Sequence, residues 1–176
     1  MNCPSLRPYI AALLLVGATA VSLPATPEEK LAELKLTLPT AFTPVHTYVP
    51  TVRTGNLVFV AGHVSRHHDG KVIAGKLGRD LDEKQGAAAA RQTALWLIAT
   101  LKRDLGDLSR IKRIVRVGGF VNCTDNFTTQ PIVINGCSDL LVAVFGERGR
   151  HARAALGTNA LPLGAAVEIE MVVEVE

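Results

Sequence analysis

The chain has 176 residues, of which 48% are hydrophobic and 20% are charged, and its formal net charge is +3. This length suits one domain with its own core and is short for two, and the composition excludes a disordered chain. The positive charge is too small and too dispersed to predict nucleic-acid binding. The three cysteines have no paired spacing, so they predict neither a disulfide framework nor a metal site.

The first 25 residues are expected to lie outside the folded domain. They combine an early arginine with no acidic residue, an apolar run over 9–21, and a small-residue pattern at 18–20 that resembles a cleavage site. The apolar run is short for a membrane span, so no stable membrane anchor is expected. We predict that residues 1–25 form a targeting segment, either secretory or mitochondrial, and that residues 26–176 form one domain.

The domain is predicted to begin with a short helix, followed by an apolar strand. Residues 26–29 (Thr-Pro-Glu-Glu) form a capping box with proline in the first turn. A helix is therefore expected to about Leu34, with Leu31 and Leu34 facing inward. A turn at 53–56 leads into the strand 57–62, which has no polar side chain and is expected to be buried on both faces.

The longest helix is predicted near the middle of the chain. Asp80 with Glu83 provides a start signal, apolar residues recur every three to four positions as far as Leu105, and Gly106 ends the helix. Its small residues at 87–90 allow close packing against a sheet. The preceding segment, 63–78, is polar and glycine-rich, which predicts a loop with one short strand near 72–73.

A second long strand and another helix follow. Residues 111–122 are predicted to be a strand, and Gly118 and Gly119 indicate a bulge or the close approach of another backbone. Pro131 occupies the first turn of the next helix, whose apolar stripe runs from Val133 to Phe145. Cys137 falls within this stripe and is predicted to be a small core residue.

The last two strands carry the candidate site. Residues 167–175 alternate between apolar and mostly acidic side chains, which is typical of a strand with one buried face. Residues 152–157 are also predicted to be extended, and 161–164 provide a turn between the two strands. We therefore expect Arg153 and Glu168 to be neighbours across a hairpin.

This order of elements predicts an α+β fold, in which two helices pack against one face of a sheet. The remaining segments are too short to cover the other face of the sheet. Self-association is therefore expected, because an apolar sheet face needs a cover.

From about residue 26 to residue 176 the chain resembles the RidA family, also called YjgF or endoribonuclease L-PSP proteins. The resemblance rests on the sequences at 152–154, 161–162 and 167–170, and on the spacing of Tyr48, 55–56 and Gly62; patterns at 135–141 and 149–153 mark a longer subgroup. It implies a chorismate-mutase-like fold with one mixed sheet, assembled as a homotrimer around a central barrel. Three clefts would then lie between subunits.

The resemblance also implies an activity, the hydrolysis of reactive enamines and imines such as 2-iminobutanoate and 2-iminopropanoate to 2-oxo acids and ammonia. Arg153 would bind the substrate carboxylate, because a planar guanidinium can pair with both oxygens. Glu168 would position or deprotonate the attacking water. Tyr48, Gly62 and Asn135 would line the substrate site. No cofactor or metal is implied, and the expected partners are the small acid and the other subunits rather than DNA.

The chain departs from the family pattern at three positions. Ala61 stands where many members have serine, and Ala155 where some have cysteine. His63 replaces a glutamine and is a candidate proton shuttle, because an unperturbed imidazole has a pKa near 6.5, or else a residue of the cleft rim.

Three alternatives remain open. The two alanines favour a non-catalytic trimer that binds small carboxylates. Cleavage of single-stranded RNA is the other activity associated with the family, and the low aromatic content of 5% argues against it. Considered without the resemblance, Arg153 is equally explained by a structural ion pair with Glu168 or Glu170.

Overall fold

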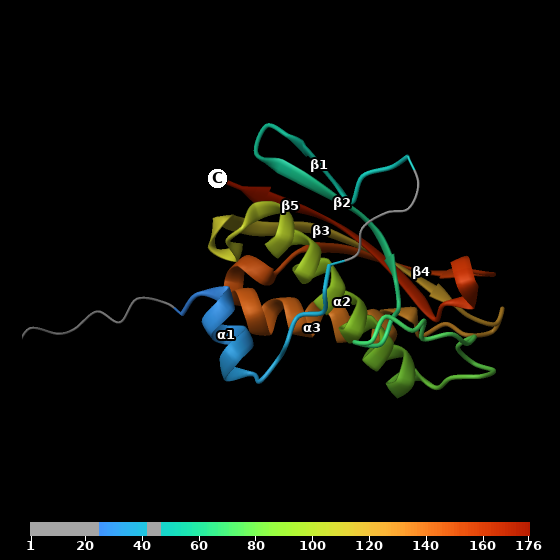
Figure 1. Ribbon diagram of the computed structural model, residues 1–176. Helices are drawn as coiled ribbons and strands as arrows, with labels where there is room; N and C mark the ends of the chain where they lie inside the picture. The colour runs from blue at the N-terminus through green and yellow to red at the C-terminus, as the bar shows by residue number, and fades with distance from the viewer. Residues whose placement is uncertain (1–24, 42–46) are drawn as a thin grey trace, which may run out of the picture.

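The computed structural model describes residues 25–41 and 47–176 (Figure 1). The prediction of a targeting segment therefore lies outside the described residues, apart from its last position. The helices are α1 (Pro27–Glu33), α2 (Glu83–Leu105) and α3 (Gln130–Phe145), and the strands are β1 (Thr51–Thr54), β2 (Leu57–Val64), β3 (Ile111–Asn122), β4 (Ala152–Thr158) and β5 (Val167–Val175). Among the described residues, no helix combines the length and hydrophobicity that a membrane crossing requires.

The five strands form one mixed sheet in the order β1-β2-β5-β3-β4. All neighbouring pairs are antiparallel except β3 and β4, which run parallel. The prediction that β4 and β5 form a hairpin was wrong, because β3 lies between them. The reason is the helix α3, which leads from β3 to β4. A crossover of this kind returns the chain in the same direction and places β4 beside β3.

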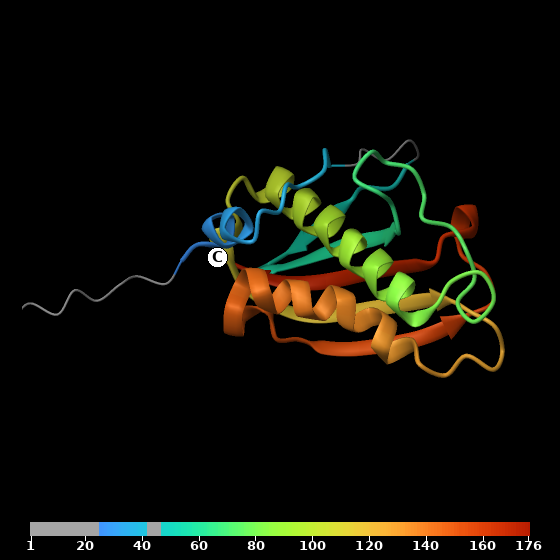
Figure 2. The same ribbon diagram turned by 90° about the horizontal axis from the view of Figure 1, so that it is seen from below.

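Helices α2 and α3 lie side by side across one face of the sheet, as predicted, and none of the helices in the described part of the chain lies over the other face (Figures 1 and 2). The alternation of β5 matches this arrangement, since every second side chain from Val167 to Val175 is buried and those between are partly exposed. The buried stripe predicted for α3 is also confirmed, including Cys137. The core therefore lies between the two helices and the sheet.

Strand β2 was predicted to be buried on both faces, and this was wrong. Val58 and Val60 are buried under the helices, whereas the side chain of Phe59 is 46% exposed. Phe59 pairs with Val52 on one side and with Val172 on the other, and paired residues point to the same side of a sheet. An apolar row thus crosses the helix-free face, which we call the open face.

Several predicted boundaries move by a few residues. Helix α1 ends before Leu34, which is 39% exposed and does not face inward, whereas Leu31 is buried as predicted. Helix α2 begins two residues later than predicted, because Asp82 and Gln85 form its capping box. The short strand near 72–73 consists only of isolated bridges.

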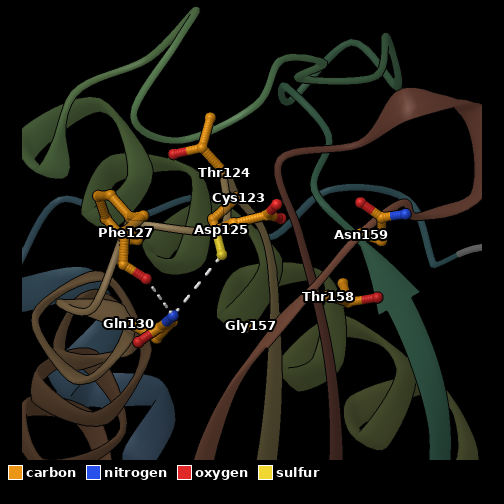
Figure 3. A pocket seen from close by; sticks show the side chains of 8 residues that line it. All are labelled: Cys123, Thr124, Asp125, Phe127, Gln130, Gly157, Thr158 and Asn159. Carbon is orange, nitrogen blue, oxygen red and sulfur yellow. Dashed lines mark hydrogen bonds between the residues drawn. The ribbon is translucent and has the colours of Figure 1, made fainter.

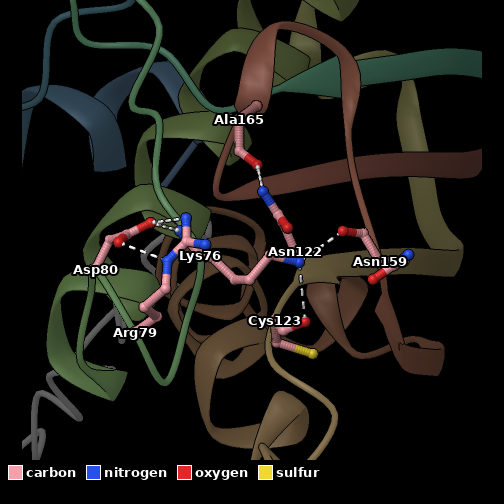
Figure 4. Close-up of polar contacts among 7 residues, drawn as sticks. All are labelled: Lys76, Arg79, Asp80, Asn122, Cys123, Asn159 and Ala165. Atoms are coloured by element: carbon pink, nitrogen blue, oxygen red, sulfur yellow. Dashed lines mark hydrogen bonds and ion pairs between the residues drawn. The ribbon is translucent and has the colours of Figure 1, made fainter.

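The loop before α2 is tied to the far end of the sheet by polar contacts (Figure 4). Lys76 donates from Nζ to the carbonyl oxygens of Cys123 and Asn159, at 3.3 and 2.6 Å. Asp80, predicted to start α2, instead binds the backbone N–H of Lys76 and the guanidinium of Arg79. These bonds hold the pKa of Asp80 at about 2. The loop is therefore anchored where β3 and β4 end.

Small residues allow the two long helices to pack closely against each other. A Cβ at Gly136 in α3 would overlap the backbone carbonyl of Ala87 in α2. The small residues predicted to bring α2 close to a sheet thus also bring it close to α3. The prediction of a bulge or a close backbone approach at Gly118 and Gly119 was wrong. Both glycines pair with β5 without a register shift, and a Cβ there would meet the side chains of Glu170 and Ile134 respectively.

Replacing Gly136 by alanine is expected to destabilise the protein. In an open helix interior the same change stabilises by about 1 kcal/mol, but here the added methyl group forces the helices apart, at a cost of about 1–3 kcal/mol. The measurement is thermal unfolding of Gly136→Ala beside Asp139→Ala, an exposed position of the same helix. A melting temperature for Gly136→Ala at or above that of the wild type would contradict this packing.

Candidate functional site

Arg153 lies on the edge strand β4 and is held by two side chains of α3. It is aligned with Val117, whose side chain is buried, so Arg153 faces the helix side of the sheet. Its Nη1 donates to Oδ1 of Asn135 at 2.9 Å and to Oγ of Ser138 at 3.0 Å. Arg153 and Asn135 were both predicted as site residues, and the structure brings them into contact.

This arrangement leaves one edge of the guanidinium available. Nη1 carries two hydrogens, and both are donated to acceptors on α3. Both hydrogen bonds that Arg153 makes within the described part of the chain use Nη1, and the side chain is exposed. The edge formed by Nε and Nη2 is therefore open to a ligand. Two parallel N–H groups on such an edge match the two oxygens of a carboxylate.

Ser138 and His151 also belong to this cluster, although the sequence analysis did not identify them as site residues. Ser138 Oγ lies 3.0 Å from Nε2 of His151, whose Nδ1 lies 2.7 Å from the carbonyl oxygen of Gly149. The spacing held a signal for both residues. Ser138 lies three positions after Asn135 on the helix, a separation that places two side chains on one face. His151 lies just before β4, two positions before Arg153, and in an extended chain this separation also places side chains on one face.

Glu168 lies on the open face of the sheet, on the central strand β5. It pairs with Phe120 of β3, which in turn pairs with the exposed Leu156 of β4. Gly62 lies beneath its carboxylate, and a Cβ at this position would overlap the Glu168 side chain. The glycine predicted to make room for a ligand thus also makes room for the candidate base.

The pKa of Glu168 is raised above its ordinary value. Partial burial is the larger cause, because it penalises the charged form, and the nearby carboxylate of Glu170 adds to it. Arg153 has no part in the shift, because its side chain lies on the helix side of the sheet.

The ion pair that was the alternative explanation for Arg153 is not formed. Glu170 pairs instead with Arg116, at 2.9 Å between carboxylate and guanidinium. Both residues border a hollow of about 480 Å³ on the open face, whose lining is otherwise mainly apolar: Val49, Val52, Phe59, Val60, Ala61, Met171 and Val172. The open face therefore combines apolar surface with partly buried acids.

The structure places His63 away from this open face. His63 pairs with the buried Ile169 of β5 and is itself only 8% exposed. Its Nδ1 bonds to the carbonyl of Ala61, and its Nε2 lies 2.9 Å from the hydroxyl of Thr100 in α2. Burial lowers its pKa. His63 thus faces the helices, on the side of the sheet opposite Glu168 of the same chain.

Tyr48 lies just before β1, and its side chain is 52% exposed. Among the described contacts, none joins it to Arg153 or Glu168. The described residues also contain no group of three or more histidine, cysteine or acidic side chains arranged to hold a metal ion.

A separate polar hollow of about 380 Å³ lies at the far end of β4 (Figure 3). Its lining includes Cys123, Gly157 and Gln130, and Gln130 donates to the carbonyl oxygen of Phe127 and to Sγ of Cys123. Gly157 is four positions beyond Arg153 on the strand, a separation of roughly 13 Å in an extended chain. This hollow therefore does not belong to the Arg153 cluster.

The two halves of the candidate site face opposite sides of one sheet. Arg153 and Asn135 lie on the helix side at the edge strand, whereas Glu168 and Gly62 lie on the open face. A small molecule bound to Arg153 of one chain is thus separated from Glu168 of that same chain by the sheet.

Residues 28–175 match a family model described as "YjgF/chorismate_mutase-like, putative endoribonuclease". A curated relative, Protein TCP17 of Trypanosoma cruzi, is 44% identical over 145 residues, covering 82% of this chain and 91% of the relative. Among solved structures, protein Atu1372 of Agrobacterium tumefaciens aligns with 42% identity and a TM-score of 0.80, covering 85% of this chain and 92% of its own.

Two further solved structures extend the similarity. A "putative endoribonuclease" of Shewanella oneidensis is 34% identical with a TM-score of 0.82, covering 86% of this chain and 100% of its own. RidA from an Antarctic Psychrobacter species is 25% identical with a TM-score of 0.53, covering 77% of this chain and 94% of its own. The fold and the sequence similarity thus extend over nearly all of the described domain.

Removing the charge of Glu168 is expected to stabilise the fold at neutral pH. Because its pKa is raised in the folded state, the folded chain binds this proton more tightly than the unfolded chain, and ionisation costs stability. Glu168→Gln should therefore unfold at higher denaturant than the wild type at pH 8. This difference in stability should shrink as the pH falls and vanish below 4.5, the ordinary pKa of a glutamate side chain.

The measurement is urea unfolding of both proteins across this pH range. Asp139→Asn, at an exposed position of α3, controls for the loss of one negative charge. A difference between Glu168→Gln and wild type that does not change with pH would show that the carboxylate is not penalised by burial.

Proposed function

The chain belongs to the YjgF/chorismate mutase-like family, which includes RidA proteins, and on this basis we propose that it hydrolyses reactive 2-imino acids to 2-oxo acids and ammonia. The observation that carries the proposal is the guanidinium of Arg153, whose Nη1 is held by two acceptors while its other edge is open. This geometry suits a small carboxylate, and the substrates 2-iminopropanoate and 2-iminobutanoate each carry one.

In the binding step, Nε and Nη2 of Arg153 pair with the two carboxylate oxygens of the imino acid. Asn135 and Ser138 prevent the guanidinium from turning, so less conformational entropy is lost when the ligand binds. The fork also fixes the plane of the carboxylate, and with it the direction of the adjacent imine carbon. Arginine thus provides orientation as well as charge.

In the chemical step, Glu168 accepts a proton from water as the water oxygen attacks the carbon of the protonated imine, which gives a neutral carbinolamine. Glu168 then returns this proton to the amino group, which leaves as ammonia. The carbonyl of the 2-oxo acid forms as the hydroxyl proton passes to Glu168 and from there to ammonia, so that the products are the 2-oxo acid and ammonium. Partial burial supports this role, because a carboxylate with a raised pKa is a stronger base than an exposed one. Gly62 allows the carboxylate to lie close to the sheet, and Tyr48 contributes a hydroxyl group to the cleft.

We propose that the site is shared between copies of the chain in a homotrimer. Arg153 and Glu168 of one chain face opposite sides of the sheet, so a site that uses both takes them from different chains. The exposed side chains of Val52, Phe59 and Leu156 support this assembly, since an apolar sheet face of this kind favours burial against a partner.

The proposal is tested by ammonia release from 2-iminobutanoate, generated in situ by a pyridoxal-phosphate-dependent dehydratase. Arg153→Ala is expected to lower kcat/KM by on the order of 100-fold, because a charged hydrogen-bonding partner of the carboxylate is lost. Arg153→Lys should recover only part of this loss, since an ammonium group has no planar fork. Arg150→Ala, an exposed arginine paired with Glu147, is the matched control and should behave as the wild type.

Equal rates in wild type and Arg153→Ala would exclude the proposed role of Arg153. If the wild type releases no ammonia but is stabilised against heat by 2-oxobutanoate, and Arg153→Ala is not, the chain is a carboxylate-binding protein without turnover. Cleavage of single-stranded RNA that persists in Arg153→Ala would instead indicate the endoribonuclease activity named for relatives. Sedimentation of the wild type tests the trimer separately.

A further inference from the structure

The ring of His151 has a defined arrangement of protons. Its Nδ1 lies 2.7 Å from the carbonyl oxygen of Gly149, and a carbonyl oxygen only accepts, so Nδ1 carries the hydrogen. In the neutral ring Nε2 is then an acceptor. Oγ of Ser138 lies 3.0 Å from Nε2, so the hydroxyl of Ser138 donates to it.

A further hydrogen bond joins Ser138 to Arg153, and the donors in this series all point the same way. Since the hydrogen of the Ser138 hydroxyl is directed to His151, the lone pairs of its oxygen are available on the other side. One of them accepts from Nη1 of Arg153 at 3.0 Å. Every donor in this chain points the same way, from Arg153 through Ser138 and His151 to the carbonyl of Gly149. Hydrogen bonds aligned in this way polarise and strengthen one another.

The end of this chain of hydrogen bonds is rigid. Gly149 is buried against α3, and a Cβ at this position would overlap the backbone carbonyl of Leu141. Its own carbonyl therefore has a fixed place. Partial burial and the nearby charge of Arg153 both lower the pKa of His151, which favours the neutral ring that this arrangement needs.

From these contacts we infer that Ser138 and His151 are positioning residues, which hold the guanidinium of Arg153 so that its Nε and Nη2 edge meets a carboxylate ligand. This inference rests on the proposed function of Arg153. His151 does not touch the ligand. It acts through Ser138, by taking the hydroxyl hydrogen and so directing the oxygen lone pairs to Nη1. Asn135 alone would leave the long side chain, on an exposed edge strand, with one anchor.

The test uses the full-length protein and 2-oxobutanoate as the probe, with binding measured by calorimetry. Ser138→Ala is expected to raise Kd by about threefold to tenfold, which corresponds to the typical net contribution of one hydrogen bond. His151→Phe keeps a ring but removes the acceptor, and should have a similar effect. In the deaminase assay the change should appear in KM, with kcat altered less than about twofold.

The double variant Ser138→Ala/His151→Phe tests whether His151 acts on Arg153 through Ser138, an arrangement that we call the relay, or whether the two residues act independently. If His151 acts only through Ser138, the double variant binds no more weakly than Ser138→Ala alone. In an Arg153→Ala background, neither Ser138→Ala nor His151→Phe should weaken binding of 2-oxobutanoate further. Additive losses would overturn the relay and indicate two separate structural roles.

Failure of the relay is distinguishable from failure of the proposed function. If Arg153→Ala abolishes binding while Ser138→Ala and His151→Phe bind as the wild type, the relay alone is overturned. If Arg153→Ala binds as the wild type, the role of Arg153 itself is excluded. Nitrogen-15 NMR of the wild type gives a measurement without any variant: His151 should carry its hydrogen on Nδ1, and a hydrogen on Nε2 would overturn the inference.

Discussion

The crossover from β3 through α3 into β4 is the constraint on which the candidate site depends. Because α3 lies across the sheet between these two parallel strands, it runs beside the strand that it leads into. The acceptors Asn135 and Ser138 are therefore next to Arg153, although 15 to 18 positions separate them along the chain. A hairpin in place of this crossover would have put Arg153 beside Glu168 and left α3 without a charged partner.

The one-sided sheet gives the two halves of the site different environments. On the helix side, Arg153 is fixed by polar groups and remains exposed. On the open face, Glu168 is partly buried beside Phe120 and Gly62, and this burial, together with the nearby carboxylate of Glu170, raises its pKa. The proposed carboxylate binding requires a cationic group, which Arg153 provides. The proposed proton transfer requires an acid that retains a proton more readily, which Glu168 provides.

Much of the fold was predictable from the sequence, because hydrophobic periodicity and capping signals are local. The strand at 111–122 and the buried stripe of α3 were predicted correctly from such patterns. The pairing of strands was not, since a turn at 161–164 gives no sign of which strand lies beside β4. The burial of β2 was also mispredicted, because an apolar run does not distinguish a covered face from an open one.

The candidate residues were predictable as types but not in their arrangement. Arg153 and Asn135 were identified through the resemblance, and their contact follows from the path of α3. His63 was predicted near the cleft, but a register shift in β2 between Val60 and His63 aligns it with buried Ile169. Ser138 and His151 were missed, because their spacing from Asn135 and Arg153 places them on one face but does not reveal the hydrogen bonds that join them.

The space under Glu168 links two positions that are far apart in the chain. Because a side chain at Gly62 would overlap the end of the Glu168 side chain, a larger residue at 62 requires the carboxylate to move or a smaller residue at 168. Gly118 and Glu170 are linked in the same way on the neighbouring strand pair. The constraint runs in one direction, since the acid can be lost while the glycine stays. A natural variant that has lost either glycine should therefore also have a changed or displaced acid beside it.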